Sequence, residues 1–445
     1  MGNSSADTVL IAALSLDSDV VTQRCQKLFR NESVNEIAAP AHTAEYNCPK
    51  IRVDISQIKL QESTHTDGRT AITSCGGAVT FQDVCIGRAS AEDLVCQMTQ
   101  QEMALLCIGA ARVSFNDFSV IGNASKSIPG AAGDTTGRLA HYGLPQCAMA
   151  DGPAGIRVNP KVYERADGYI NNIAEDPIMS KILPSELQKI DLSGTTVKYQ
   201  YCTALPIAVQ LAQTWDPPLL EAAGDMVGVE MEELGIDLWL APGMNIQRNP
   251  LCGRNFEYYS EDPLLSGIFA ASLTWGVQRH PGKGVCIKHL AANNQETNRA
   301  TSNSHVSEQA LREIYLKGYE ICVKSAQPFS AMTSMNLLNG IHTANDPDLL
   351  IHALRDEWGF DGIVMTDWGV TGSYVTPGGS RRYGPATPVG CINAGNDLIM
   401  PGTSFDEESL LAALEDGALS TGALRTCAVR IVKLLVKCSP GMGEI

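Results

Sequence analysis

Polar side chains that directly follow apolar runs are the places in this sequence that could carry chemistry. The clearest case is Asp367, which follows the apolar run 362–365 and precedes Trp368. A carboxylate at the end of a buried strand can attack an anomeric carbon, and a neighbouring indole can stack on a sugar ring. An aspartate that only caps a loop has the same pattern, so the spacing alone leaves both roles open.

A second cluster, Lys288 and His289, follows the apolar run 284–287. Two adjacent cationic or donor groups at a strand end suit the recognition of hydroxyl or carboxylate groups. A salt bridge of Lys288 beside a hydrogen-bonded histidine is the purely structural alternative. A lyase or aldolase that uses Lys288 as a Schiff base is disfavoured, because polar residues rather than an apolar pocket follow this lysine.

Two arginines lie in further polar motifs. Asp151 and Arg157 frame a rigid turn, DGPAGIR, which combines one acid with one guanidinium. Arginine is well suited to binding two neighbouring acceptors at once. Arg254 lies in the segment 253–263, which is so dense in charged and aromatic residues that it would be unusual as a mere loop.

Composition and charge exclude several classes of function. The chain of 445 residues has a net charge of −16 and no basic run longer than Arg381-Arg382, which disfavours nucleic acid and anionic membranes as partners. The longest apolar stretch, 9–16, is too short to cross a bilayer and has no basic flank, so we predict neither a membrane span nor a signal peptide. The 14 cysteines are scattered without a C-x-x-C pair. We therefore expect free thiols in a reducing cytoplasm, and neither a metal site nor a cofactor.

The elements that must position these clusters alternate between strands and helices. Short apolar runs end in a polar cluster and are followed by helical segments, for example a helix capped by Ser307 that stops before Pro328. This alternation predicts an α/β fold with a parallel sheet. Polar clusters at the C-terminal ends of strands fit a doubly wound sheet or a (β/α)8 barrel, and the absence of a G-x-G-x-x-G motif or P-loop favours the barrel. The expected strands are 147–150, 236–240, 284–287, 329–332, 362–365 and 397–400.

Other segments mark the limits of this alternation. Residues 1–75 have the pattern of an irregular arm that contains strands, so we divide the chain into this arm and a barrel domain at 76–445. Ser90 and Thr99 are expected to begin two short helices near the start of that domain. Residues 161–197 form a long insertion, which we predict to be a loop over the active face.

Together, the polar motifs resemble glycoside hydrolase family 3, the β-glucosidase type. The resemblance covers about 91–436 and rests on motifs in the family's order: DGPAGIR from 151, LAPGMNIQRNPLCGRNFEYYSEDP from 240, KHLAANNQETNR from 288 and LRDEWGFDGIVMTDWG from 354. It implies a (β/α)8 barrel that hydrolyses terminal non-reducing β-D-glucosyl or related β-glycosyl residues of a β-glucoside or oligosaccharide, with retention. It also implies that Asp367 is the nucleophile, that Asp151, Arg157, Arg254, Lys288 and His289 hold the sugar hydroxyls, and that Met332 and Trp368 shape the subsite.

Two features depart from the family's pattern. Met335 stands where relatives carry a tyrosine whose phenol donates a hydrogen bond to the nucleophile, and the loss of such a bond is worth about 1.5–3 kcal/mol. Retention also needs a second carboxyl group about 5–5.5 Å from the nucleophile. In β-glucosidase-type relatives that acid/base comes from a separate α/β sandwich domain, which we do not find in this sequence. The first 50 residues, for example 20–28, resemble the tail of the upstream module of relatives with reversed domain order, so the arm is expected to be a remnant of such a module.

The source of the acid/base stays open. A partner chain or a second copy could supply it, or Glu257, Glu261 or Glu296 could act in its place. Alternatively, the barrel binds sugars with weakened catalysis. A further alternative is the family's single-domain N-acetylhexosaminidases, which use a histidine in a K-H-F-P-G-H-G-like motif, but 288–294 has no second histidine.

Overall fold

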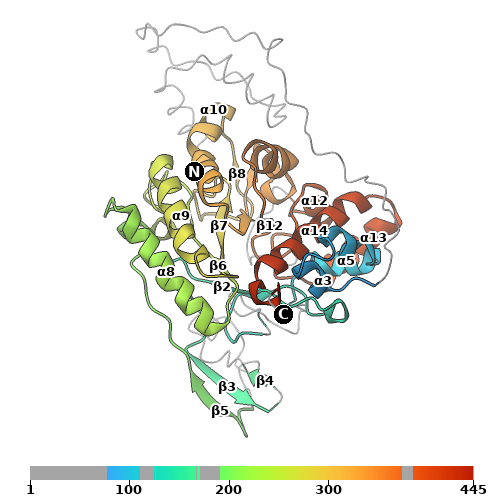
Figure 1. Cartoon of the computed structure of the whole chain (residues 1–445). Coiled ribbons are helices and arrows are strands. Elements are labelled where there is room, and N and C mark those ends of the chain that lie inside the picture. Colours follow the sequence, from blue (N-terminus) through green and yellow to red (C-terminus); the bar gives the residue numbers. More distant parts are fainter. Residues whose placement is uncertain are drawn as a thin grey trace, which may run out of the picture.

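The computed structural model describes residues 78–110, 125, 127–166, 168–170, 191–372 and 384–443. The predicted arm at 1–75 lies outside the described residues. Over the described residues the chain forms an α/β body, from which a small antiparallel sheet projects (Figure 1). No helix in these ranges is long and apolar enough to cross a membrane, and the cysteines within them are free thiols.

A six-stranded sheet lies at the centre of this body. Its order is β1-β2-β6-β7-β9-β12, and every neighbouring pair from β2 onward is parallel. The strands are β1 (Gly133–Asp134), β2 (Ala148–Asp151), β6 (Leu238–Leu240), β7 (Gly284–Leu290), β9 (Ser330–Thr333) and β12 (Ile363–Met365). Nearly all of their residues are buried, as expected when helices cover a parallel sheet.

Single β-bridges join the two edges of this sheet into a ring. The bridged pairs are Met365–Leu398, Ile399–Ile108 and Gly109–Thr135. The parallel strands and their closure confirm the predicted α/β barrel, although β1 pairs antiparallel with β2. The predicted strand at 397–400 is present only as these bridges. A separate small sheet contains β8 (Asn303–Ser304), β10 (Leu337–Leu338) and β11 (Ile341–His342).

Helices pack around the ring. Helices α8 (Pro217–Leu234), α9 (Pro263–Gln278) and α11 (Lys317–Ala326) pack together, and α14 (Thr421–Lys437) packs with α4 (Ala91–Cys96) and α5 (Gln100–Leu106) (Figure 1). Two apolar cores result, one that includes Trp239 and one that includes Phe81. The other α- and π-helical segments among the described residues are α3 (Phe81–Cys85), α7 (Ala208–Ala212), α10 (Glu308–Ala310), the π-helical Leu311–Tyr315 and Asp348–Glu357, α12 (Pro388–Asn393) and α13 (Ser404–Glu415).

The helix starts follow the capping signals in the sequence. Ser90 and Thr99 each form a capping box, at the starts of α4 and α5 respectively. Ser307 caps α10, and the helical path then runs through the π-helical segment Leu311–Tyr315 into α11. The three predicted starts are confirmed.

Glycines let α8 and α9 approach each other closely. A Cβ atom added at Gly276 of α9 would clash with the backbone of Glu221 in α8, and one added at Gly224 of α8 would clash with the backbone of Leu273. The close packing of the two helices matters for the site, because α9 in turn packs against β7, which carries Lys288.

The prediction of a loop at 161–197 is wrong where the structure describes this insertion. Strands β3 (Lys161–Arg165), β4 (Gly168–Ile170) and β5 (Thr196–Tyr199) form an antiparallel sheet in the order β4-β3-β5. Valine and tyrosine residues in β3 and β5 favour extended backbone, which explains the difference. Figure 1 shows this sheet projecting from the lower end of the molecule. Residues 171–190 of the insertion lie outside the described residues.

Candidate active site

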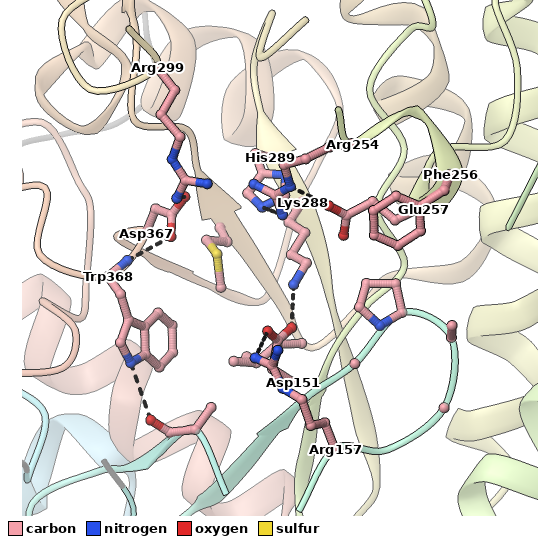
Figure 2. A pocket seen from close by; sticks show the side chains of 17 residues that line it. Asp151, Arg157, Arg254, Phe256, Glu257, Lys288, His289, Arg299, Asp367 and Trp368 are labelled. Carbon is pink, nitrogen blue, oxygen red and sulfur yellow. Dashed lines mark hydrogen bonds and ion pairs between the residues drawn. The ribbon is translucent and has the colours of Figure 1, made fainter. Parts of the chain in front are cut away.

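A cavity of about 440 Å³ lies at the C-terminal ends of the parallel strands. Figure 2 shows Asp367 and Trp368 on one side of it and Asp151 and Arg157 on the other. The structure brings together every residue that the sequence placed in a sugar subsite: Asp151, Arg157, Arg254, Lys288, His289, Met332, Asp367 and Trp368. Side chains more than 200 positions apart in the chain thus meet in one place, because β2, β7, β9 and β12 are neighbours or near neighbours in the sheet.

Asp151 is held between two cations. Its Oδ1 accepts a hydrogen bond from Nζ of Lys288 at 2.5 Å, and its Oδ2 accepts one from Nη2 of Arg157 at 2.6 Å. Burial by itself raises the pKa of Asp151, but the charges of Lys288 and Arg157 outweigh it and lower the pKa from 3.8 to about 2. The carboxylate is therefore ionised at neutral pH and is a fixed acceptor on this side of the cavity.

His289 is a neutral, anchored ring. Only 1% of the residue is exposed, and burial together with the charges of Arg254 and Lys288 lowers the pKa of His289 well below 6.5. Nη2 of Arg254 lies 2.8 Å from Nε2 of the ring, so we infer that the ring proton is on Nδ1, which faces the Tyr258 hydroxyl at 3.4 Å. The histidine thus lines the cavity and orients the guanidinium of Arg254.

Arg254 is fixed from its other side by Glu257. Its Nε donates to a carboxylate oxygen of this buried glutamate. Burial opposes the charge of the arginine, but Tyr258, Glu257 and Asp367 raise the pKa of Arg254 above its ordinary value. The guanidinium is consequently a permanent cation that lines the cavity beside His289 (Figure 2).

Asp367 follows β12, as the sequence predicts, and its two oxygens differ. Oδ1 accepts a hydrogen bond from the backbone N–H of Trp368 at 2.7 Å. Oδ2 is buried and has no hydrogen-bond partner. The Trp368 indole is fixed by its Nε1, which donates to the carbonyl of Ala132 at 3.2 Å. The carboxylate and the indole therefore lie side by side with set orientations, as nucleophilic attack and ring stacking would require.

The sequence analysis missed Arg299, which also lines the cavity. Its Nη2 lies 4.0 Å from Oδ2 of Asp367. The same guanidinium donates from Nε and Nη2 to the sulfur of Met335, at 3.1 and 2.8 Å. The only sequence signal was its place at the end of the motif 288–299. The contact with Asp367 joins segments about 70 positions apart, and local spacing does not reveal it.

The glutamates considered as substitute acids have other contacts. Glu257 binds Arg254, as expected from its place in that motif, and Glu296 accepts from Nη1 of Arg299 at 3.2 Å. Glu261 is exposed and does not line the cavity. Within the described ranges, no group of three or more histidine, cysteine, aspartate or glutamate side chains is arranged to hold a metal ion.

Comparison with known proteins decides the family. A family model described as the glycosyl hydrolase family 3 N-terminal domain matches residues 180–434. The chain belongs to this family. The resemblance inferred from the motifs is thus confirmed, and the family 3 barrel accounts for the α/β ring and for the cavity at the ends of its strands.

Relatives of this family 3 chain include enzymes of two specificities. It is 36% identical over 301 residues to the exo-alpha-(1->6)-L-arabinopyranosidase of Bifidobacterium longum, covering 68% of this chain and 34% of that protein. It is 35% identical over 343 residues to the thermostable beta-glucosidase B of Acetivibrio thermocellus, covering 77% of this chain and 37% of that protein. The chain therefore spans about a third of the length of these relatives.

A solved structure shares the fold. Beta-glucosidase 3B from Thermotoga neapolitana, determined in complex with glucose, superposes with a TM-score of 0.63 at 40% sequence identity. The match covers 78% of this chain and 43% of that structure. The barrel described above is accordingly the part that the two proteins have in common.

Proposed function

We propose that this chain is the nucleophile-bearing part of a retaining family 3 exo-glycosidase that acts on terminal, non-reducing β-D-glucosyl or related glycosyl residues. The observation that carries the proposal is the cavity in which the Asp367 carboxylate lies opposite the Asp151–Lys288–Arg157 cluster. The matched relatives named beta-glucosidase and the one crystallised with glucose support a hexose as substrate. The arabinopyranosidase relative leaves the choice of sugar open.

The charged cluster suits the recognition of neighbouring hydroxyl groups. A hydroxyl can donate to Asp151 and accept from Lys288 or Arg157 at the same time, because these groups already lie within hydrogen-bond distance of one another. Hydrogen bonds to charged groups contribute about 1.5–3 kcal/mol each. Arg254, held by Glu257 and His289, adds a further donor to the lining of the cavity. We propose that Met332 and Trp368 form the apolar surface against which the ring lies.

In the proposed reaction, a carboxylate oxygen of Asp367 forms a bond to the anomeric carbon while the bond to the leaving-group oxygen breaks. The leaving oxygen takes a proton from a general acid. Water then attacks the anomeric carbon, gives its proton to the same group acting as base, and releases the Asp367 carboxylate. The two inversions give net retention.

We propose that the general acid/base lies outside the described residues, for example on a partner chain or a second copy of this chain. The described glutamates of the site are bound to Arg254 and Arg299, which supports this division. A chain tested alone would then release the phenol from aryl glucosides, whose leaving groups need no proton, but would not cleave cellobiose. Equal activity on both substrates would place the acid within the chain. The free thiols of the described residues favour a reducing compartment, and we propose the cytoplasm.

The second candidate function is a barrel that binds sugars with weakened catalysis. The unpartnered Oδ2 of Asp367 and the thioether of Met335, which has no hydrogen to donate, favour it. Incubation with a 2-deoxy-2-fluoro-β-glucoside that carries a good leaving group separates the two functions. We expect a mass adduct on the Asp367 peptide, absent in Asp367→Asn and present in the surface control Asp416→Asn. Glucose binding by calorimetry without any adduct would instead establish the binding function.

A further inference from the structure

The two oxygens of Asp367 are in unequal surroundings. Oδ1 is held by the Trp368 N–H, whereas Oδ2 is buried without a hydrogen-bond partner. Among the ion pairs that the described residues form, the one that reaches Oδ2 is with Nη2 of Arg299, at 4.0 Å. This separation is too long for a hydrogen bond and short enough for a direct charge interaction, which water screens in part because 30% of the Arg299 side chain is exposed.

Arg299 is held at this distance by two other contacts. Nη1 donates to Glu296 at 3.2 Å, and Nε and Nη2 donate to the sulfur of Met335 at 3.1 and 2.8 Å. A thioether is a weak, uncharged acceptor, so the charge of the guanidinium is shared between Glu296 and Asp367 alone among these contacts. Figure 2 shows Arg299 reaching Asp367 from the side opposite Trp368. The carboxylate is thus fixed between a backbone donor and a cation.

We propose that Arg299, seated on the sulfur of Met335, is the positioning residue of the nucleophile and stabilises Asp367 as the leaving group of the second half-reaction. The inference rests on the proposed function. Asp367 loses its negative charge when it bonds to the anomeric carbon and regains it when that bond breaks. A fixed cation 4.0 Å away favours the state in which the charge is present, so it accelerates the second step and not the first.

The test follows the two steps separately on the whole chain. A 2-deoxy-2-fluoro-β-glucosyl fluoride labels Asp367, because the carboxylate bonds to the anomeric carbon as fluoride departs. Azide is then added: its nitrogen bonds to the anomeric carbon, the bond to Asp367 breaks, and the carboxylate leaves with the electron pair. Neither step needs a proton donor, so an acid/base group outside the chain does not affect the measurement.

The variants separate charge from structure. Arg299→Gln is expected to slow release by azide about tenfold, or about 1.4 kcal/mol, while it changes labelling less than about threefold. Arg299→Lys keeps the charge and should restore most of the release rate. Met335→Leu keeps the bulk but removes the acceptor, and should slow release in the same direction by a smaller factor. Arg279→Gln, which removes an exposed cation of the Glu221 pair, serves as the control.

The outcomes are distinguishable. Equal slowing of both steps in Arg299→Gln, or no slowing of release, would overturn the role of Arg299 while the labelled wild-type chain upholds the proposed function. A wild-type chain that takes no label at Asp367 would overturn the proposed function and this inference with it.

Discussion

Replacing Asp151 by asparagine removes the anion that joins Lys288 to Arg157. The decrease in the pKa of Asp151 from 3.8 to about 2 corresponds to about 2.4 kcal/mol of stabilisation at neutral pH. The Asp151 side chain is 21% exposed, but that of Arg157 is 54% exposed and its contribution is screened by water, so we expect about 2 kcal/mol. The substitution also leaves Lys288 without its ion-pair partner. Because the Lys288 side chain is only 4% exposed, this loss decreases the free energy of unfolding further.

The pH dependence of this loss follows from the direction of the shift. A carboxyl group whose pKa is lowered by folding stabilises the protein above its unfolded pKa of 3.8, and the stabilisation disappears as the pH falls toward 2. The difference in the free energy of unfolding between the wild type and Asp151→Asn should therefore have its full value at pH 7 and about half of that value at pH 3.

Urea unfolding at both pH values measures the difference, with Asp416→Asn as an exposed control. Calorimetry on the same proteins should show glucose binding weakened at least about tenfold in Asp151→Asn, because a charged hydrogen bond worth about 1.5–3 kcal/mol is lost. Equal stability of the two proteins at pH 7, or a difference that does not narrow in acid, would contradict the ion-pair reasoning.

Three further predictions concern stability, each measured by urea unfolding. Burial and the charge of Asp348 raise the pKa of Asp346 from 3.8 to about 7, so the wild type loses stability as the pH rises from 4 through 7. The free energy of unfolding of Asp346→Asn should therefore increase relative to that of the wild type over this range. A difference between the two free energies that stays constant with pH would contradict the prediction. Arg355 donates to the buried Asp397 at 2.6 Å, and Arg355→Met should cost about 3 kcal/mol; a neutral effect would show that Arg430 alone balances the charge. Gly276→Ala should cost about 1–3 kcal/mol by separating α8 from α9. The matched Gly422→Ala, whose Cβ has room in α14, should be neutral or stabilising, and equal effects of the two glycine variants would refute the packing argument.

Much of the fold was predictable because it depends on local pattern. The runs before Asp151 and Asp367 are short, apolar and followed by polar residues, and they form β2 and β12 as expected. The helix starts at Ser90 and Thr99 follow from a side chain that binds a backbone N–H three residues later.

What local pattern could not predict depends on distant contacts. The antiparallel strand β1 is only two residues long and is defined by its pairing with β2. The role of Arg299 depends on a contact with Asp367 and on the sulfur of Met335, which come from separate segments. The insertion at 161–197 was misjudged for a different reason, because its β-forming residues were outweighed by its length and polarity.

The bridge between Ile108 and Ile399 determines how late in the synthesis of the chain the ring can close. Ile399 is translated about 290 residues after Ile108, which at about 5–20 residues per second is an interval of about 15–60 s. During this interval the ring is not closed. Helices α4 and α5 also lack their packing partner α14, which follows Ile399 in the chain and packs on them in the finished barrel (Figure 1). Until Ile399 has been translated, the nascent barrel therefore lacks the partners that cover its sheet edges and apolar helix faces, and such surfaces are prone to aggregate.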